Sequence, residues 1–187
     1  MRVHLPAEMA DRPFENLGRA YPTHVVQSAG IYGTAPYQHS MLTLRELEGA
    51  RYRTALINGC QACTALRGAR DFPGLFAAFD GDVENSVWSR GPAPDEEFYA
   101  QVENWRDWPG FSERERLAIC YAEAMGLDPR GLAANEDFWR QAKAVFSDAE
   151  IVDMTYSIGA WMANGRALHV LGMDAVCSFE LPGKAAA

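Results

Sequence analysis

The sequence of 187 residues contains no run of about 18 apolar residues and no cluster of Lys and Arg side chains. A helix that crosses a bilayer needs such an apolar run. The chain carries 17 basic and 25 acidic side chains, which leaves a net charge of −8. This charge repels phosphate backbones and anionic membrane surfaces, and no local basic patch offsets it. We therefore expect neither nucleic acid nor a membrane as a partner.

Cysteine is scarce, with four residues in the chain. The first residues, MRVHLPAEMADRPFENLG, place acids and a proline where a secretory signal needs an apolar segment. We therefore expect a cytoplasmic protein, in which four cysteines do not form a stabilising disulfide framework. The hydrophobic content of 48% is enough for one ordinary core. A Cys-x-x-Cys motif in this setting is typically catalytic or metal-binding.

Helix signals occupy most of the chain, and strict alternation of apolar and polar residues is rare. Three capping boxes begin at Thr43, Ser112 and Ser147. Asn58-Gly59 is a typical helix stop, because glycine adopts the left-handed conformation without strain. We predict an all-α fold built around antiparallel helical hairpins. The expected helices span residues 43–58, 60–71, 74–79, 95–105, 112–126, 136–146, 147–164 and 166–171.

Residues 1–40 give the weakest signals, because prolines and glycines interrupt them. The segment His24–Gln27 is compatible with an extended strand or with a helical turn. We predict two parts in the chain. Residues 1–40 form an N-terminal extension packed on the core, and residues 41–187 form the helical domain.

A possible internal repeat follows from two Asn-Gly dipeptides, at residues 58–59 and 164–165. Each is expected to end one helix and to lead into another, and in this register His169 takes the place of Cys63. A duplication and a chance recurrence of a common helix stop both explain the pattern.

The stretch NGCQAC, residues 58–63, places two thiols three positions apart at the expected start of a helix. Unpaired amide groups and the helix dipole favour a negative charge there, which lowers the pKa of a thiol. One sulfur can then act as a nucleophile and the other can close a disulfide on it. Arg67 follows Cys63 by four residues, so we expect its cation on the same helix face.

Glu48 and Arg67 lie at similar distances from the Asn-Gly turn, in helices that the tight turn makes antiparallel. Both are roughly 12 to 15 Å from the turn at the rise of an α-helix. We predict a Glu48–Arg67 ion pair beside Cys63. A structural salt bridge of Glu48 with Arg45, Arg51 or Arg67 is the alternative.

The segment ELEGARYRTALINGCQACTALRGAR resembles the active-site segment of the AhpD-type alkylhydroperoxidases, within the carboxymuconolactone decarboxylase superfamily. The pattern of that family is Glu, twelve residues later Cys-x-x-Cys, and then a His after three further residues. Glu48, Cys60 and Cys63 match it in identity and spacing. The resemblance extends over about residues 41–172 and implies an all-helical, self-associating protein.

The resemblance implies that Cys63 is the thiol attacked by peroxide, Cys60 the thiol that resolves it as a disulfide, and Glu48 the acid of a proton relay. The His of the family falls on Arg67, which cannot be deprotonated in a protein and only holds charge. Glu48 with water, or another histidine, would then have to move the protons; otherwise turnover is weak.

Less specific explanations exist for the same residues. Cys60 and Cys63 could be small buried packing residues. A zinc site needs about four ligands, and Cys120, Cys177 and His169 would have to complete it without any paired spacing. His169 is more commonly a satisfied core or surface imidazole. We predict no metal and no cofactor, with Cys60, Cys63, Glu48 and Arg67 as the site.

Three functions remain open. The favoured one is a thiol-dependent peroxidase or disulfide oxidoreductase that uses a small-molecule hydroperoxide and is recycled by a dithiol protein or a small thiol. The second is a decarboxylase of the same superfamily, in which Arg67 would bind a substrate carboxylate. The third is a non-catalytic, redox-responsive protein. Amphipathic hairpins rich in Met and Trp also predict a homo-oligomer.

Overall fold

The computed structural model describes residues 1–11, 13–78 and 81–175, and every regular element within them is a helix. The all-α prediction is confirmed. No helix in this part of the chain is long and apolar enough to cross a membrane. The α-helices are α1 (Pro13–Ala20), α2 (His24–His39), α3 (Leu44–Asn58), α4 (Gln61–Ala65), α5 (Gly68–Ala78), α6 (Glu96–Gln101), α7 (Glu113–Leu127), α8 (Pro129–Ala133), α9 (Glu136–Val145) and α10 (Asp148–Leu171). Short 3-10 turns lie at Ala7–Met9, Val87–Ser89 and Val102–Asn104.

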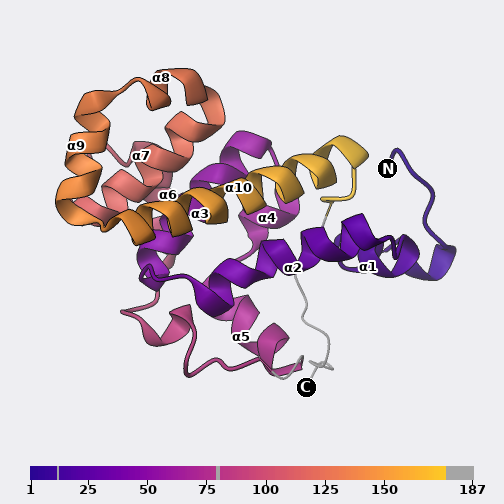
Figure 1. Cartoon of the computed structure of the whole chain (residues 1–187). Coiled ribbons are helices and arrows are strands. Elements are labelled where there is room, and N and C mark those ends of the chain that lie inside the picture. Colours follow the sequence, from indigo (N-terminus) through magenta and orange to yellow (C-terminus); the bar gives the residue numbers. More distant parts are fainter. Residues whose placement is uncertain (12, 79–80, 176–187) are drawn as a thin grey trace.

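The centre of the molecule is α3, which packs on α7 and on α10. Leu47 of α3, Ala118 of α7 and Ile158 of α10 are fully buried in one hydrophobic cluster. Helices α7, α8 and α9 form one end of the molecule, and α2 runs along α10 on the opposite side from them (Figure 1). The short helix α4 lies near the C-terminal half of α10 (Figure 1).

The predicted starts of the main helices are confirmed. In each capping box the N-cap hydroxyl accepts the N3 amide and the N3 carboxylate accepts the N-cap amide, which satisfies two donors at the helix end. The three boxes are Thr43 with Glu46, Ser112 with Glu115, and Ser147 with Glu150. Gly59 ends α3 in the left-handed conformation, with φ of 66°, as its sequence predicts.

The helix after Cys60 is shorter than predicted. It ends at Ala65, and a second helix, α5, begins at Gly68 and continues through Pro73. The cause is the buried guanidinium of Arg51, which donates to the carbonyl oxygens of Cys63 at 2.6 Å and Leu66 at 2.9 Å. A side chain that takes the last carbonyl groups ends the helix there.

The predicted helix break at Asn164-Gly165 is wrong, because α10 runs without interruption to Leu171. Both residues serve a close helix crossing instead. The Asn164 amide donates to the carbonyl of Ala29 in α2 at 2.9 Å, and a Cβ on Gly165 would lie 2.6 Å from the Asn58 amide nitrogen. The helix, Asn-Gly, helix pattern therefore occurs at residues 58–59 alone of the two, and the internal repeat is not supported.

Residues 24–39, left open by the sequence, form the single helix α2. Thr23 caps it by accepting the amide of Val26 at 3.2 Å. Gly33 lies inside it where α2 meets α10, since a Cβ there would approach the Asn164 amide nitrogen to 2.6 Å. The division of the chain near residue 41 stays a prediction.

Candidate redox site

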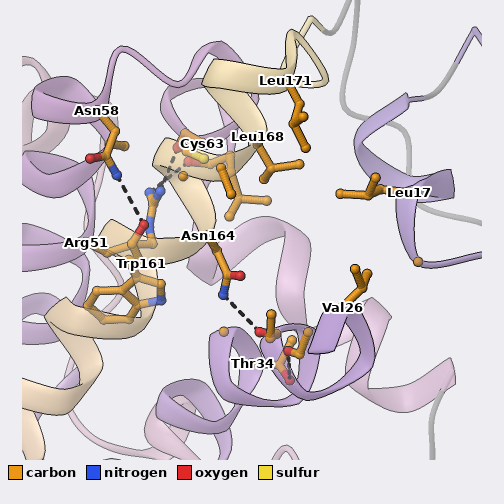
Figure 2. Close-up of a pocket in the computed structure, with 18 of the residues that line it drawn as sticks. Leu17, Val26, Thr34, Arg51, Asn58, Cys63, Trp161, Asn164, Leu168 and Leu171 are labelled. Carbon is orange, nitrogen blue, oxygen red and sulfur yellow. Dashed lines mark hydrogen bonds between the residues drawn. The ribbon is translucent and has the colours of Figure 1, made fainter. Parts of the chain in front are cut away.

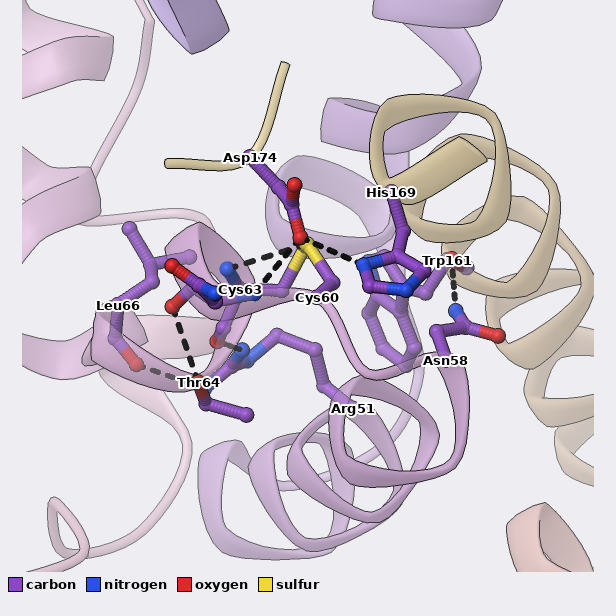
Figure 3. The surroundings of a disulfide bond; sticks show 10 residues. Arg51, Asn58, Cys60, Cys63, Thr64, Leu66, Trp161, His169 and Asp174 are labelled. Carbon is purple, nitrogen blue, oxygen red and sulfur yellow. Dashed lines mark hydrogen bonds and ion pairs between the residues drawn. A yellow bond between two sulfur atoms is a disulfide. The ribbon is translucent and has the colours of Figure 1, made fainter. Parts of the chain in front are cut away.

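Cys60 and Cys63 are joined by a disulfide at the start of α4 (Figure 3). Cys60 is the N-cap residue, and its sulfur accepts the amide of Cys63 at 3.3 Å. Cys60 is completely buried, whereas Cys63 is partly exposed. The two sulfurs are thus in position to exchange between dithiol and disulfide, and they differ in access.

Glu48 is completely buried in α3, and neutral and charged donors surround its carboxylate. The hydroxyl groups of Tyr37 and Tyr99 donate to it at 2.5 and 2.6 Å, the amide of Gly68 donates at 2.9 Å, and Arg51 donates at 2.7 Å. Burial alone raises the pKa of Glu48, but the charge of Arg51 and these hydrogen bonds outweigh it and hold the pKa below its usual value. Glu48 therefore remains ionised.

Arg51 connects this carboxylate to the redox motif. Its guanidinium contacts Glu48 on one side and the carbonyl groups of Cys63 and Leu66 on the other. The side chain of Arg51 is 3% exposed, so the pair lies out of water. The ion pair fixes the geometry of α4 relative to α3.

The predicted Glu48–Arg67 ion pair is wrong. Arg67 lies beyond the end of α4, so it does not share a helix face with Cys63. Its guanidinium pairs with Glu96 at 2.9 Å and stacks over the ring of Tyr99, with 4.4 Å to the centroid. The partner of Glu48 is Arg51, which the sequence had offered as an alternative.

His169 and Asp174 adjoin the motif from the other side (Figure 3). The Nδ1 atom of His169 lies 2.9 Å from Oδ2 of Asp174, and the same oxygen accepts the amide of Gln61 at 3.1 Å. The carbonyl of Asp174 accepts the amide of Ala62 at 2.9 Å. Burial by itself raises the pKa of Asp174, but the hydrogen bonds from His169 and Gln61 hold it below its usual value.

An apolar cavity of about 670 Å³ opens beside Cys63. Its walls come mainly from the N-terminal helices and from α10, with Leu17, Val26, Leu168 and Leu171 around the space, and Cys63 is also part of the wall (Figure 2). Trp161 also borders the cavity. Its indole N–H is buried and has no hydrogen-bond partner among the described residues.

The part of the chain that the structure describes contains no cluster of side chains that could bind a metal ion. No group of three or more His, Cys, Asp or Glu side chains gathers there. Cys120 is a free thiol on α7 that packs against the core, and burial raises its pKa. Cys177 lies outside the described residues.

Several site residues were missed by the sequence analysis. Tyr37, Tyr99 and Asp174 carried no recognisable signal, because no motif links them to the site. Tyr37 and Tyr99 lie 11 and 51 residues from Glu48, and Asp174 lies 113 residues from Gln61. The spacing of Glu48 and Arg51, three residues apart on one helix, was the one local sign of their pairing. His169 was considered and given the less specific explanation.

A scan against protein-family models and a search of the curated proteins gave no match. Among solved structures, the chain is similar to a protein of unknown function from Agrobacterium tumefaciens, described as a proposed antioxidant defence protein AhpD. The TM-score is 0.62 and the identity 24%, over 84% of this chain and 93% of the other. The similarity shows that the chain has this AhpD-like all-α fold.

Proposed function

We propose that the protein is a thiol-dependent peroxidase that reduces an organic hydroperoxide with an apolar body. The observation that carries the proposal is the position of Cys63, which belongs to the redox pair and also borders the apolar cavity. A cavity with few polar groups favours the hydrocarbon part of a substrate.

In the proposed reaction, the thiolate of Cys63 attacks the outer oxygen of the peroxide. The S–O bond forms, the O–O bond breaks, and the alcohol leaves with a proton. The sulfur of Cys60 then attacks Cys63, so that the disulfide forms and water leaves. Two thiols and one hydroperoxide thus give one disulfide, one alcohol and one water. An external dithiol protein or small thiol reduces the disulfide again.

Cys63 is the better candidate for the attacking sulfur. It is partly exposed and adjoins the cavity, whereas Cys60 is completely buried and caps α4. Glu48 enters the proposal as the residue that holds Arg51 and so the turn after Cys63. The resemblance gives it a proton-relay role instead, which its buried ion pair and its hydrogen bonds do not favour.

The decarboxylase alternative is weaker. It needs the guanidinium of Arg67 for a substrate carboxylate, and that guanidinium is already bound to Glu96. It also leaves the cysteine pair without a use.

Thiol counting tests the proposal. The reduced protein receives one equivalent of cumene hydroperoxide, and free thiols are counted in the parent, Cys63→Ser and Cys60→Ser. We expect rapid loss of both motif thiols in the parent, none in Cys63→Ser, and a trapped sulfenic acid on Cys63 in Cys60→Ser. Continued hydroperoxide consumption with excess dithiothreitol then establishes turnover.

Two results would contradict the proposal. If the thiols of Cys60 and Cys63 stay reduced after hydroperoxide is added, the protein is not a peroxidase. Stoichiometric oxidation without turnover, with dithiothreitol able to reduce the disulfide, favours a redox-responsive protein instead.

A further inference from the structure

The proposed reaction of the two thiols requires proton transfers. Glu48 and Arg67, the residues that the sequence suggested beside the thiols, are both held in ion pairs. Each thiol must lose its proton, and the alcohol and the water must each gain one. Glu48 is buried and held by four donor residues, and Arg67 is paired with Glu96 and cannot be deprotonated. A different group has to do this work.

His169 meets the requirements of position and access. A Cβ built on Gly59 would lie 3.4 Å from Cε1 and 3.5 Å from Nε2 of the His169 ring, so the imidazole lies against the residue directly before Cys60. The side chain is 50% exposed, which leaves it free to exchange protons with water. Imidazole is the side chain that changes charge near neutral pH.

Asp174 orients this ring. Its carboxylate accepts the Nδ1–H of His169, which leaves Nε2 as the site that takes up or releases a proton. The Asp174 side chain is 8% exposed. Its carboxylate also accepts the amide of Gln61, and its carbonyl accepts the amide of Ala62, so Asp174 fixes the position of the imidazole ring relative to the backbone between the two cysteines. Figure 3 shows the carboxylate between the imidazole and the start of α4.

We propose that His169, positioned by Asp174, exchanges the protons of the Cys60–Cys63 pair. The proposal rests on the peroxidase function. Neutral His169 takes the proton of the Cys63 thiol and returns it to the leaving alkoxide as the O–O bond breaks. It then takes the proton of the Cys60 thiol and gives it to the hydroxide that leaves as the disulfide forms. The two thiol protons thus end on the alcohol and the water.

Other charged groups near this corner are accounted for. Arg166 of α10 donates to Asn58 at 3.0 Å and to the carbonyl of Gly126 at 3.0 Å. The amino nitrogen of Met1 would lie 3.2 Å from a Cβ on Gly172, at the C-terminal end of α10. Arg51 faces Cys63 from α3. The Arg51 and Arg166 guanidiniums do not change charge near neutral pH, so they cannot produce a neutral-pH limb. The Met1 amino group is unchanged in the variants below, so any effect of it is common to the parent and the variants.

The competing explanation is purely structural, with the His169–Asp174 pair only clamping the C-terminal segment to α4. The test therefore uses His169→Asn, whose amide can keep a donor to Asp174 but cannot take up a proton. His39→Asn, at an exposed histidine in the last turn of α2, is the matched control. Thermal unfolding verifies that each variant is folded, and His169→Gln replaces the first variant if it is not.

The first measurement needs no peroxide. Reduced protein is alkylated with iodoacetamide from about pH 5 to about pH 9, and the peptide with Cys60 and Cys63 is followed by mass spectrometry. In His169→Asn we expect the alkylation curve to move toward higher pH by about one unit, which is a roughly tenfold lower rate at pH 7. The control should follow the parent.

The second measurement is the pH dependence of motif-thiol oxidation by cumene hydroperoxide. We expect oxidation to be roughly 100-fold slower in His169→Asn. We also expect the variant to lose the change in rate that the parent shows near neutral pH. Free imidazole should restore the rate several-fold in His169→Ala, because the ring site is open to solvent. A clamp would give neither the lost pH dependence nor the rescue.

The outcomes separate the two proposals. A parent that ignores hydroperoxide, combined with a shifted alkylation curve in His169→Asn, removes the peroxidase and retains the role of His169 toward the thiols. An alkylation curve and a pH profile that match the parent in a folded His169→Asn overturn the proposal, whether or not the parent is a peroxidase.

Discussion

Glu48 illustrates how one buried residue organises the redox motif from a distance. Its carboxylate joins α3 to the start of α5 through the amide of Gly68, and through Arg51 to the carbonyl of Cys63. A Cβ on Gly68 would lie 2.5 Å from the Glu48 carboxylate, so a glycine is required where the backbone approaches it. The charge of Glu48 matters because, within the part of the chain that the structure describes, Glu48 is the acid that pairs with Arg51.

Replacing Glu48 by Gln should therefore be strongly destabilising. The change leaves the Arg51 guanidinium buried without its counter-charge, and breaking a buried pair in this way costs about 3 kcal/mol or more. Urea unfolding of the parent and the variant measures the difference. Asp137→Asn is the control, because Asp137 and Arg140 form a pair of the same spacing that is 75% and 72% exposed, and we expect little change there. Equal effects of the two substitutions would refute the role of burial.

The same substitution has a pH signature. The folded protein holds the pKa of Glu48 below its usual value, so the stabilisation by its ionised form is complete above the unfolded pKa of about 4.3 and is lost as the pH falls through the folded pKa. The gap in free energy of unfolding between parent and Glu48→Gln should thus be widest near neutral pH and narrow below about pH 4. Urea unfolding at a series of pH values measures it, and a gap that widens in acid would contradict the assignment.

Among the helices, the crossing of α2 with α10 determines the wall of the cavity. Two glycines three residues apart in α2 have different surroundings. A Cβ on Gly30 would meet nothing within 4 Å, whereas a Cβ on Gly33 would lie 2.6 Å from the amide nitrogen of Asn164. That amide is held by its bond to Ala29. The structure therefore favours glycine at position 33 because α2 and α10 approach each other closely there, and not because the chain turns.

The two positions should respond with opposite signs to alanine. Gly30→Ala should stabilise the protein by about 0.5 to 1 kcal/mol, because alanine loses less backbone entropy in a helix. Gly33→Ala should destabilise it by about 1 kcal/mol, since the added methyl group displaces Asn164. Thermal unfolding of both variants tests this. Stabilisation by both would mean that Asn164 moves aside freely.

For the molecule as a whole, the cavity is the feature that would distinguish an organic hydroperoxide from hydrogen peroxide. Its walls combine segments from both ends of the chain with Cys63 from the start of α4. Hydrogen peroxide is too small and too polar to gain from such walls, whereas a hydrocarbon body gains by leaving water.

Filling the cavity should therefore change selectivity. Val26→Trp places a large ring in the space, and we expect KM for cumene hydroperoxide to rise about tenfold, the effect of losing roughly 1.4 kcal/mol of apolar contact. The rate with hydrogen peroxide should stay within about twofold. Val152→Trp, at an exposed site of α10 outside the cavity, is the control. Equal losses with both peroxides would show that the cavity does not hold the substrate.

The sequence by itself determined the features that depend on residues close together in the chain. Each capping box spans four residues, and the Asn58-Gly59 stop with the cysteines just after it is equally local. Such signals need no distant partner, because the hydrogen bonds that produce them form within one or two helical turns. The helical class, the main helix starts and the position of the two sulfurs follow from them.

Only the tertiary structure decided which partner each charged or small residue takes. Arg67 binds Glu96, 29 residues away, and Glu48 binds Tyr99, 51 residues away. Asn164-Gly165 has the same letters as Asn58-Gly59 but continues a helix, because α2 and α3 approach it there. The physical reason is that burial and close packing, which exist only once distant segments meet, outweigh local preferences of about 1 kcal/mol.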